Sequence, residues 1–217
     1  IVTVALSLGV RRMAERNAIV KKLHAVETLG STDYICSDKT GTLTLNKMSA
    51  RRMLIGLTPT KVEGDNLIVL SEDMDAPNRS CVESLLMIGL ACNDAHYTAT
   101  GELVGDPTET ALVAAAKDLM PGLIIPKRIG EVPFDSERKR MTTVHLVVNE
   151  GVQSAWAFMR GGIDTTLPFC THAMLNGEIV ELTQEIREEI MHQNTEFAAT
   201  GFRTLAFAYR ELPDEFL

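Results

Sequence analysis

The sequence predicts an α+β domain in which an antiparallel sheet carries flanking helices. Apolar and polar residues alternate on both sides of a turn at 149–151, which predicts a hairpin of residues 141–148 and 152–159. Helix-type apolar patterns cover three other stretches, 81–93, 105–119 and 182–201. Because strands and helices follow one another without a regular βαβ alternation, an α+β arrangement is favoured over a parallel α/β sheet.

Two of these helices carry recognisable ends. Asp106 is a candidate N-cap, followed by Pro107 at the first helical position and Glu109 at the third. Thr183 is placed to cap the last helix and Gly201 to end it. These signals fix where each helix starts or stops.

The remaining elements of this domain are shorter. Strands are expected at 128–134 and 203–210, and apolar β-type runs at 51–57 and 66–70 are separated by a polar turn. The acidic stretch 71–80 is typical of a surface loop. The domain is therefore expected to extend over residues 48–210.

The first 47 residues have a different character. Ten apolar residues lead into Arg11, Arg12 and Arg16, which suits either an amphipathic helix or the cytoplasmic end of a membrane helix. A β-capable run at 18–23, a short helix at 25–31 closed by Gly30, and a strand at 32–36 should follow. This is too little to bury a core, so the segment is expected to be incomplete by itself.

Charge and cysteine content exclude several classes. The net charge of −8 argues against a nucleic-acid partner. Residues 1–47 carry a balance of +3 and the rest of the chain −11, which favours two units in different surroundings. The four cysteines show no metal-ligand spacing and sit among apolar neighbours, so all are expected to be buried free thiols.

The stretch "ICSDKTGTLTLNKM" at 35–48 carries the clearest chemistry. A carboxylate after a strand, here Asp38, can attack a phosphoryl group if Lys39 and Mg²⁺ neutralise the charge. Thr40 adds a hydroxyl, and Gly41 lets backbone N–H groups turn toward phosphate. For a bare Asp-Lys-Thr-Gly, a capped turn in which Asp38 bonds its own backbone is the commoner explanation.

The longer string "CSDKTGTLT" followed by "NKM" resembles the phosphorylation signature of the P-type ATPases. The stretches "RRMAERNAIVKKLHAVETLGS" and "GDPTETAL" look most like the type II cation pumps of that family, with a calcium-transporting-like pump favoured. The resemblance covers essentially the whole chain. It implies ATP as substrate, Asp38 as the residue that forms an aspartyl phosphate, Lys39 beside it, and a contribution of Asp38 and Thr40 to phosphate and Mg²⁺ binding.

The resemblance also implies a nucleotide pocket. In "VPFDSERKRMT" the resemblance makes Phe134 the residue that stacks on adenine and Lys139 a residue of the pocket. The residue pattern alone favours Phe134 as a core residue at a strand end, with the basic run exposed to solvent. Glu109 would reach the adenine amino group, although a reciprocal cap with Asp106 explains it too. Arg203 would approach the phosphates.

One segment departs from the family pattern. Where the family has Lys-Gly-Ala-Pro-Glu, this chain has Arg160 and Gly161 followed by Gly-Ile-Asp. Arg160 keeps the positive charge but spreads it over a planar fork, so the two side chains are not equivalent. Nucleotide binding is expected to persist with altered affinity.

The resemblance also sets the domain expectations. Residues 1–47 would be the end of a membrane helix and the first part of an α/β, haloacid-dehalogenase-like phosphorylation domain; 48–210 the inserted nucleotide-binding domain; and 211–217 the return. The family's TGD and GDGxND strings do not occur, so this chain is expected to bind ATP without turning over. Membrane helices and the transported cation's sites would lie outside it, making it a cytoplasmic portion of a membrane protein.

Two other functions stay open. One is a soluble haloacid-dehalogenase-type phosphohydrolase, although such enzymes usually carry a second Asp where this chain has Thr40. The other is a nucleotide-binding module without catalysis.

Overall fold

The computed structural model of this chain describes residues 2–63, 67–68, 76–149 and 151–216. The chain divides into two compact units, Ile1–Asn46 and Lys47–Leu217, named unit 1 and unit 2. Each is described by itself.

Unit 1 contains two helices and one irregular turn. The helices are α1 (Val2–Glu15) and α2 (His24–Gly30), and the turn is η1 (Lys39–Leu43). None of its described residues is buried. This segment therefore forms no core of its own.

Three expectations for unit 1 were wrong. Residues 18–23 and 32–36 form no strand, and Tyr34 and Ile35 are 89% and 83% exposed. A strand needs a partner to take up its backbone groups, and no described segment pairs with these residues. Gly30 is the last residue of α2 rather than a left-handed cap after it, and Ser31 is the C-cap.

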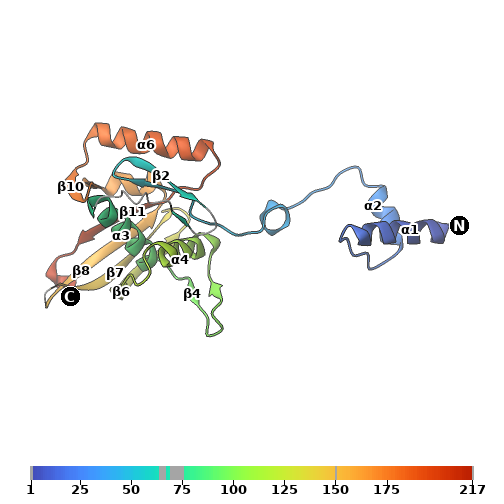
Figure 1. Ribbon diagram of the computed structural model, residues 1–217, viewed down its shortest axis with the longest axis horizontal. Coiled ribbons are helices and arrows are strands. Elements are labelled where there is room, and N and C mark those ends of the chain that lie inside the picture. Colours follow the sequence, from blue (N-terminus) through green and yellow to red (C-terminus); the bar gives the residue numbers. More distant parts are fainter. Residues whose placement is uncertain (1, 64–66, 69–75, 150, 217) are drawn as a thin grey trace. The chain divides into compact units, whose positions relative to one another are not determined.

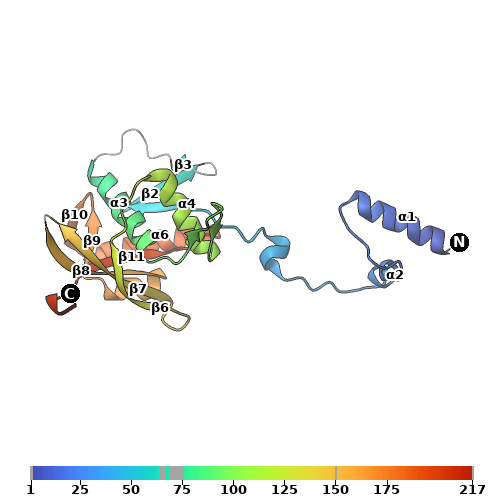
Figure 2. The ribbon, with the colours of Figure 1, turned by 90° about the horizontal axis from the view of Figure 1, so that it is seen from below.

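The centre of unit 2 is a four-stranded antiparallel sheet in the order β11 (Ala206–Glu211), β8 (Val152–Gly161), β7 (Arg140–Asn149) and β6 (Lys127–Asp135). Figure 2 shows these strands as one twisted sheet. The predicted hairpin is confirmed as β7 and β8, paired from Asn149–Val152 to Arg140–Gly161. The antiparallel sheet with flanking helices predicted for this domain is thus present.

Three small sheets complete the strands. They are β1 (Arg52–Ile55), β2 (Thr58–Glu63) and β3 (Leu67–Ile68); β4 (His96–Tyr97) and β5 (Leu103–Val104); and β9 (His172–Leu175) and β10 (Glu178–Glu181). The expected polar turn after 57 is wrong, because residues 58–61 pair with β1 and residues 62–63 with β3. Residues 69–75, which include part of the run at 66–70 and of the acidic stretch, lie outside the described part of the chain.

Helices pack on this framework. They are α3 (Ala76–Ala91), α4 (Pro107–Leu119), the short α5 (Ile163–Thr166) and α6 (Gln184–Ala199), with single turns at η2 (Leu167–Phe169) and η3 (Asp214–Phe216). Helix α3 contacts α4, β8 and β11 (Figure 1). It begins five residues before the predicted start at Cys81.

The ends of α6 are those that the sequence predicts. The Thr183 hydroxyl accepts from the Ile186 N–H at 3.4 Å. Gly201 has φ of +83°, and the Phe202 N–H donates to the Phe197 carbonyl at 3.2 Å, which is a Schellman ending. This turn leads the chain into Arg203 and then β11.

The core of unit 2 lies around α3. One face of this helix packs with β1 and α4 through residues such as Met53, Val82 and Ala116. The other face packs on the central sheet, where Phe158 is 1% exposed and Cys92 is fully buried. Because α3 is buried between the two, its C-terminal end and the start of α4 are held in place.

Candidate functional site

The start of α4 is fixed by its cap. The Asp106 carboxylate accepts from the Thr108 N–H at 2.8 Å, and Pro107 occupies the first turn. Asp106 is therefore the cap that the sequence predicts. Glu109 makes no reciprocal cap, because its carboxylate is engaged elsewhere.

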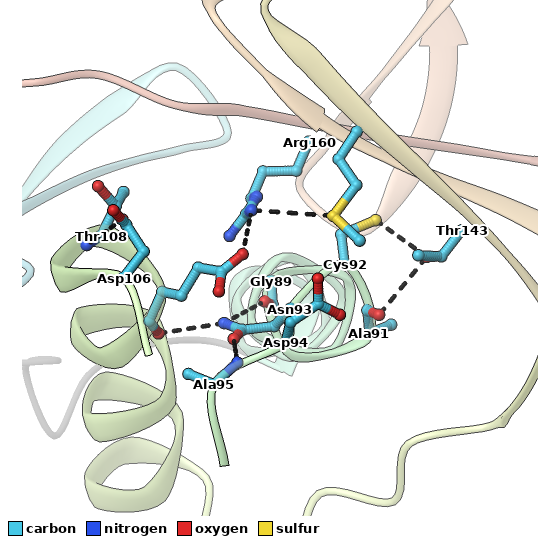
Figure 3. Close-up of polar contacts among 12 residues, drawn as sticks. Gly89, Ala91, Cys92, Asn93, Asp94, Ala95, Asp106, Thr108, Thr143 and Arg160 are labelled. Atoms are coloured by element: carbon cyan, nitrogen blue, oxygen red, sulfur yellow. Dashed lines mark hydrogen bonds and ion pairs between the residues drawn. The ribbon is translucent and has the colours of Figure 1, made fainter. Parts of the chain in front are cut away.

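Glu109 pairs with Arg160 across the domain. Arg160 Nη2 donates to Glu109 Oε1 at 2.7 Å, and the two side chains are 9% and 13% exposed (Figure 3). Met141, opposite Arg160 on β7, places its Sδ 4.0 Å from the same Nη2. The other guanidinium nitrogen, Nη1, is buried without a hydrogen-bond partner among the described residues.

Asn93 ties the two helices together below this ion pair. Its side-chain amide donates to the carbonyls of Gly89, at 3.2 Å, and Glu109, at 3.1 Å, while its oxygen accepts from the Ala95 N–H at 2.8 Å (Figure 3). Asn93 is 8% exposed. All its polar atoms are thus used to hold the backbone of Glu109 against the end of α3.

Arg203 lies beside the same helix start. Its Nη1 donates to the Thr108 hydroxyl at 3.0 Å. Strand β11 begins at Ala206 rather than at Arg203 as predicted, so Arg203 lies in the preceding loop, which the Schellman turn of α6 positions. Two arginines from distant parts of the chain therefore meet consecutive residues of α4.

Phe134 and Lys139 flank the turn between β6 and β7. Phe134 is 60% exposed at the end of β6, so it is not the core residue that a strand-end position allows. The Asp135 carboxylate accepts from the N–H groups of Arg138, at 2.8 Å, and Glu137, at 3.0 Å. These bonds, the one from Arg138 first, lower the pKa of Asp135. Lys139 closes the turn in a left-handed conformation with φ of +52°.

Gly161 is required by this turn. A Cβ at Gly161 would lie 2.6 Å from the Arg140 Cβ and 2.8 Å from the Lys139 carbonyl oxygen. The same carbonyl accepts from the Gly162 N–H at 3.2 Å. The close backbone approach at Gly161 is therefore to the Lys139 turn of the protein itself.

Asp38 in unit 1 forms a short turn of its own. Its carboxylate accepts from the Thr40 N–H at 3.3 Å, and Gly41 has φ of +74°. The Gly41 N–H donates to the Thr44 hydroxyl at 3.4 Å. Asp38, Lys39 and Thr40 are all exposed, so their polar groups face solvent.

The site residues fall into three groups. Glu109 and Arg160 are bonded, and Arg203 adjoins them through Thr108. Phe134 precedes the β6–β7 turn, Lys139 closes it, and Gly161 at the end of β8 packs against it. No hydrogen bond, ion pair or ring contact between described residues joins Phe134 to Glu109 or Arg160. Asp38, Lys39 and Thr40 form the third group, in unit 1.

Comparison with known proteins identifies the family. Residues 81–216, which contain the Glu109–Arg160 pair and the β6–β7 turn, match the family model of the P-type ATPase cytoplasmic domain N. The chain belongs to the P-type ATPase family. This confirms the resemblance seen in the sequence.

Individual relatives agree. The calcium-transporting ATPase 1 of Bacillus cereus is 40% identical over 97% of this chain, and that of Lactococcus lactis is 37% identical over 99%. The human sodium/potassium-transporting ATPase subunit alpha-4 is 33% identical over 99% of this chain. The chain spans only 22–23% of the length of these P-type ATPases. Among the described residues, no helix is long and apolar enough to cross a bilayer.

A large groove adjoins the domain N site of this P-type ATPase chain. Its volume is about 1220 Å³, and its lining includes Thr108, Arg138, Arg140 and Arg203 together with apolar residues of β1, β9 and β11. The Arg160 guanidinium and Glu109 do not line it. The groove thus reaches Thr108 and Arg203 at the start of α4 but does not include the buried ion pair in its lining.

Asp38 and Thr40 offer exposed oxygen ligands of the kind that Mg²⁺ prefers. Only one oxygen of Asp38 is engaged, by a long hydrogen bond, so its carboxylate and the Thr40 hydroxyl suit a hard cation. In the part of the chain that the structure describes, no group of three or more His, Cys, Asp or Glu side chains is placed to hold a metal ion. These two residues supply part of a Mg²⁺ coordination shell and not all of it.

Sequence reasoning missed Asn93, Thr108 and Met141. Thr108 follows the predicted cap directly, which could have marked it as a residue of the helix start. Asn93 follows the apolar helix α3 by two residues, where a side-chain amide can bond the last helix carbonyls. Nothing in the sequence marks Met141, whose contact with Arg160 depends on the pairing of β7 with β8.

Proposed function

We propose that unit 2 binds ATP and that the protein to which this chain belongs is an ATP-driven cation pump with Asp38 as its phospho-acceptor. The proposal rests on two contacts at the start of α4, inside the segment matched as domain N. Arg160 bonds Glu109, and Arg203 bonds Thr108. A buried acceptor and donor beside a surface guanidinium suit a ligand with a polar base and an anionic tail.

The proposed roles follow from position. Phe134, exposed on the edge strand β6, would stack on the base, and the Glu109–Arg160 pair would meet its polar edge. Arg203 would contact the phosphates, and Lys139 would add positive charge from a turn that packing at Gly161 fixes. This assignment treats residues 48–210 as the nucleotide-binding domain, with 1–47 and 211–217 as parts of a haloacid-dehalogenase-like phosphorylation domain.

The chemistry proposed for Asp38 is nucleophilic. A carboxylate oxygen attacks the γ-phosphorus, the bond from that phosphorus to the bridging oxygen breaks, and ADP leaves with the electron pair. An aspartyl phosphate results. Lys39 is placed next in the chain to offset the negative charge, and the Thr40 hydroxyl can donate to a phosphate oxygen. Asp38 and Thr40 would also contribute oxygen ligands to Mg²⁺, which supplies further charge neutralisation when bound.

The cation and the membrane are also proposals. Two of the relatives cited above are named as calcium-transporting, so a calcium-like cation is proposed, with its sites and the membrane helices outside this chain. The chain would then be a cytoplasmic portion of an integral membrane protein.

ATP binding is tested by calorimetric titration of the 217-residue chain. Phe134→Ala should weaken ATP binding at least several-fold, because base–aromatic stacking contributes about 1–3 kcal/mol. Ile129→Ala, also half-exposed on β6, is the control and should bind ATP as the parent chain does. Equal affinity in both variants would remove the stacking role of Phe134.

Phosphorylation is tested with γ-³²P-labelled ATP and Mg²⁺ in the longer protein. An acid-stable, hydroxylamine-sensitive label should form and be absent from Asp38→Asn. Release of phosphate without a trapped label would favour the phosphohydrolase alternative, and ATP binding with neither would favour a non-catalytic module. The 217-residue chain itself is expected to bind ATP without forming the label.

A further inference from the structure

The groove beside the domain N site concentrates positive charge. Residues 48–217 contain ten arginines and 25 carboxylates. Six of these arginines line the groove: Arg51, Arg52, Arg138, Arg140, Arg203 and Arg210. Among the described residues of the lining, Glu211 is the one carboxylate. Arg138, Arg140 and Arg210 form no ion pair with a described residue, so the groove keeps an excess of positive charge that attracts anions.

Arg140, at the start of β7, is placed to hold an anion in this groove. Its Nη1 donates to the Arg138 carbonyl at 3.2 Å, while its other two guanidinium nitrogens bond no described residue and are not buried. The guanidinium carbon lies 4.4 Å from the ring centroid of Phe169, which is 64% exposed and also lines the groove. A planar guanidinium with free N–H groups can bind a carboxylate through two parallel hydrogen bonds.

This position is separate from the Arg160–Glu109 pair. In the pairing of β7 with β8, Arg140 is opposite Gly161 and Met141 is opposite Arg160. Because successive side chains of a strand point to opposite faces of the sheet, Arg140 lies on the other face of the central sheet from Arg160. Of the arginines in the groove, only Arg203 has a role in the proposed nucleotide contacts. The anion site at Arg140 is therefore not used by them.

The lining next to Arg140 is largely apolar. It includes four large side chains of η2 and α6, which are Leu167, Phe169, Ile190 and Phe197. Arg187 of α6 donates to the carbonyls of Leu167, at 3.0 Å, and Cys170, at 2.6 Å, so this helix lies beside η2. No described residue of α6 is buried, although an amphipathic helix normally buries its apolar side. Uncovered apolar side chains thus adjoin an unpaired guanidinium.

We propose that this groove binds an amphiphilic anion, namely a long-chain carboxylate of the fatty-acid class, with its head group on Arg140 and its chain along the apolar side chains of η2 and α6. The groove volume of about 1220 Å³ leaves room for such a chain, since small-molecule sites typically measure about 300–1,000 Å³. Charge and apolar surface are both required, because an exposed ion pair alone contributes little and a chain alone does not neutralise the arginines. The inference does not depend on ATP binding, because neither Arg140 nor α6 has a role in the proposed ATP contacts.

Calorimetric titration of the 217-residue chain with dodecanoate, below the concentration at which it forms micelles, tests the site. One dodecanoate should bind per chain. Butanoate, which has the same head group without the long chain, and dodecyl maltoside, which has the same chain on a neutral head group, should each bind at least about tenfold more weakly. Equal binding of dodecyl maltoside would show that the arginines do not select the ligand and would overturn the proposal. Absence of dodecanoate binding would overturn it too, and dimerisation of the chain in analytical ultracentrifugation would then assign the groove to a second copy.

Variants then locate the head group. Arg140→Gln should weaken dodecanoate binding at least about fivefold, because it removes the guanidinium charge. Arg79→Gln makes the same charge change at an exposed position of α3 outside the lining and should leave the affinity unchanged. Thermal unfolding verifies that both variants are folded, and equal affinity in the folded variants would refute the role of Arg140. The comparison with dodecyl maltoside needs no substitution, so it tests the charge even where Arg140→Gln fails to fold.

ATP distinguishes this site from the nucleotide site. Dodecanoate should still bind the chain in the presence of saturating ATP. Complete displacement of dodecanoate by ATP would show that the groove is the phosphate end of the nucleotide site, which would overturn a separate site while leaving the proposed function intact.

Discussion

Arg160 on β8 and Glu109 on α4 lie 51 residues apart in sequence and join through a 2.7 Å ion pair that water hardly reaches. Removing one partner leaves the other charged and buried, a state that typically costs about 3–5 kcal/mol of unfolding free energy. Replacing both by apolar residues removes that penalty. The pair is therefore the most sensitive point of the site.

A double-mutant cycle measures this relationship. Glu109→Leu and Arg160→Met should each destabilise the chain by about 3–5 kcal/mol in urea unfolding, and the double variant should be more stable than either single one. Glu188→Gln, an exposed charge change on α6, is the control and should alter stability by less than about 0.5 kcal/mol. Additive losses in the double variant would show that the two side chains do not interact.

Position 161 should be sensitive to a single methyl group. Gly161→Ala places a Cβ 2.6–2.8 Å from the Arg140 Cβ and the Lys139 carbonyl, so the β6–β7 turn has to shift at a cost of about 1–3 kcal/mol. Gly130→Ala, whose Cβ would meet only ordinary contacts at 3.7 Å and beyond, is the matched control. Thermal unfolding of both variants tests this prediction, and equal melting temperatures would contradict the expected loss of stability in Gly161→Ala.

Stability should fall in mild acid because of His145. This side chain is 1% exposed, and burial, assisted by the nearby Arg128 charge, lowers its pKa below the ordinary value near 6.5. Above pH 6.5 the imidazole is neutral in the folded and in the unfolded chain, so its titration does not lower the free energy of unfolding. As the pH falls below 6.5, His145 binds a proton in the unfolded chain but not in the folded chain. The free energy of unfolding therefore decreases until the pH passes the pKa of His145 in the folded chain.

Urea unfolding between pH 5 and pH 8 tests this. His145→Gln should flatten the part of the profile below pH 6.5, whereas His192→Gln, exposed on α6, should leave it unchanged. An identical acid slope in the parent chain and in His145→Gln would assign the loss to other groups.

Asn93 should tolerate little change. Its amide donates twice and its oxygen accepts once, so Asn93→Asp exchanges both donors for acceptors that face two carbonyls. A loss of about 1–3 kcal/mol is expected from the unmade bonds. ATP titration should show weaker binding as well, because the Glu109 backbone is released. Unchanged stability and affinity would mean that other contacts hold α3 against α4.

Local signals predicted the local structure well. The β7–β8 hairpin, the Asp106 and Thr183 caps and the Gly201 ending were found because each depends on residues close in sequence. The expected strand at 32–36 failed because a strand also needs a partner, which no local pattern supplies. Cys36 was expected to be buried because its neighbours in the sequence are apolar. It is exposed, because that stretch packs against no other described segment.

The site was predictable only in part. Glu109, Arg160 and Arg203 were selected through the family resemblance, but the bonds that they make join residues 51 and 95 positions apart. Those bonds depend on how α4 packs on α3 and how α3 packs on the central sheet, so neither spacing nor periodicity could show them. The contact of Gly161 with the Lys139 turn likewise depends on packing between distant residues, which no local pattern shows.

The exposure of Cys36 offers a chemical handle. Cys81 and Cys92 are buried, and burial raises the pKa of the Cys92 and Cys170 thiols, which keeps them protonated and slow to react at neutral pH. A maleimide dye added in equimolar amount at pH 7 should therefore attach first at Cys36, two residues from Asp38, as peptide mass mapping would show. Such a reporter on the native cysteine could follow events at Asp38 by fluorescence without any engineered substitution.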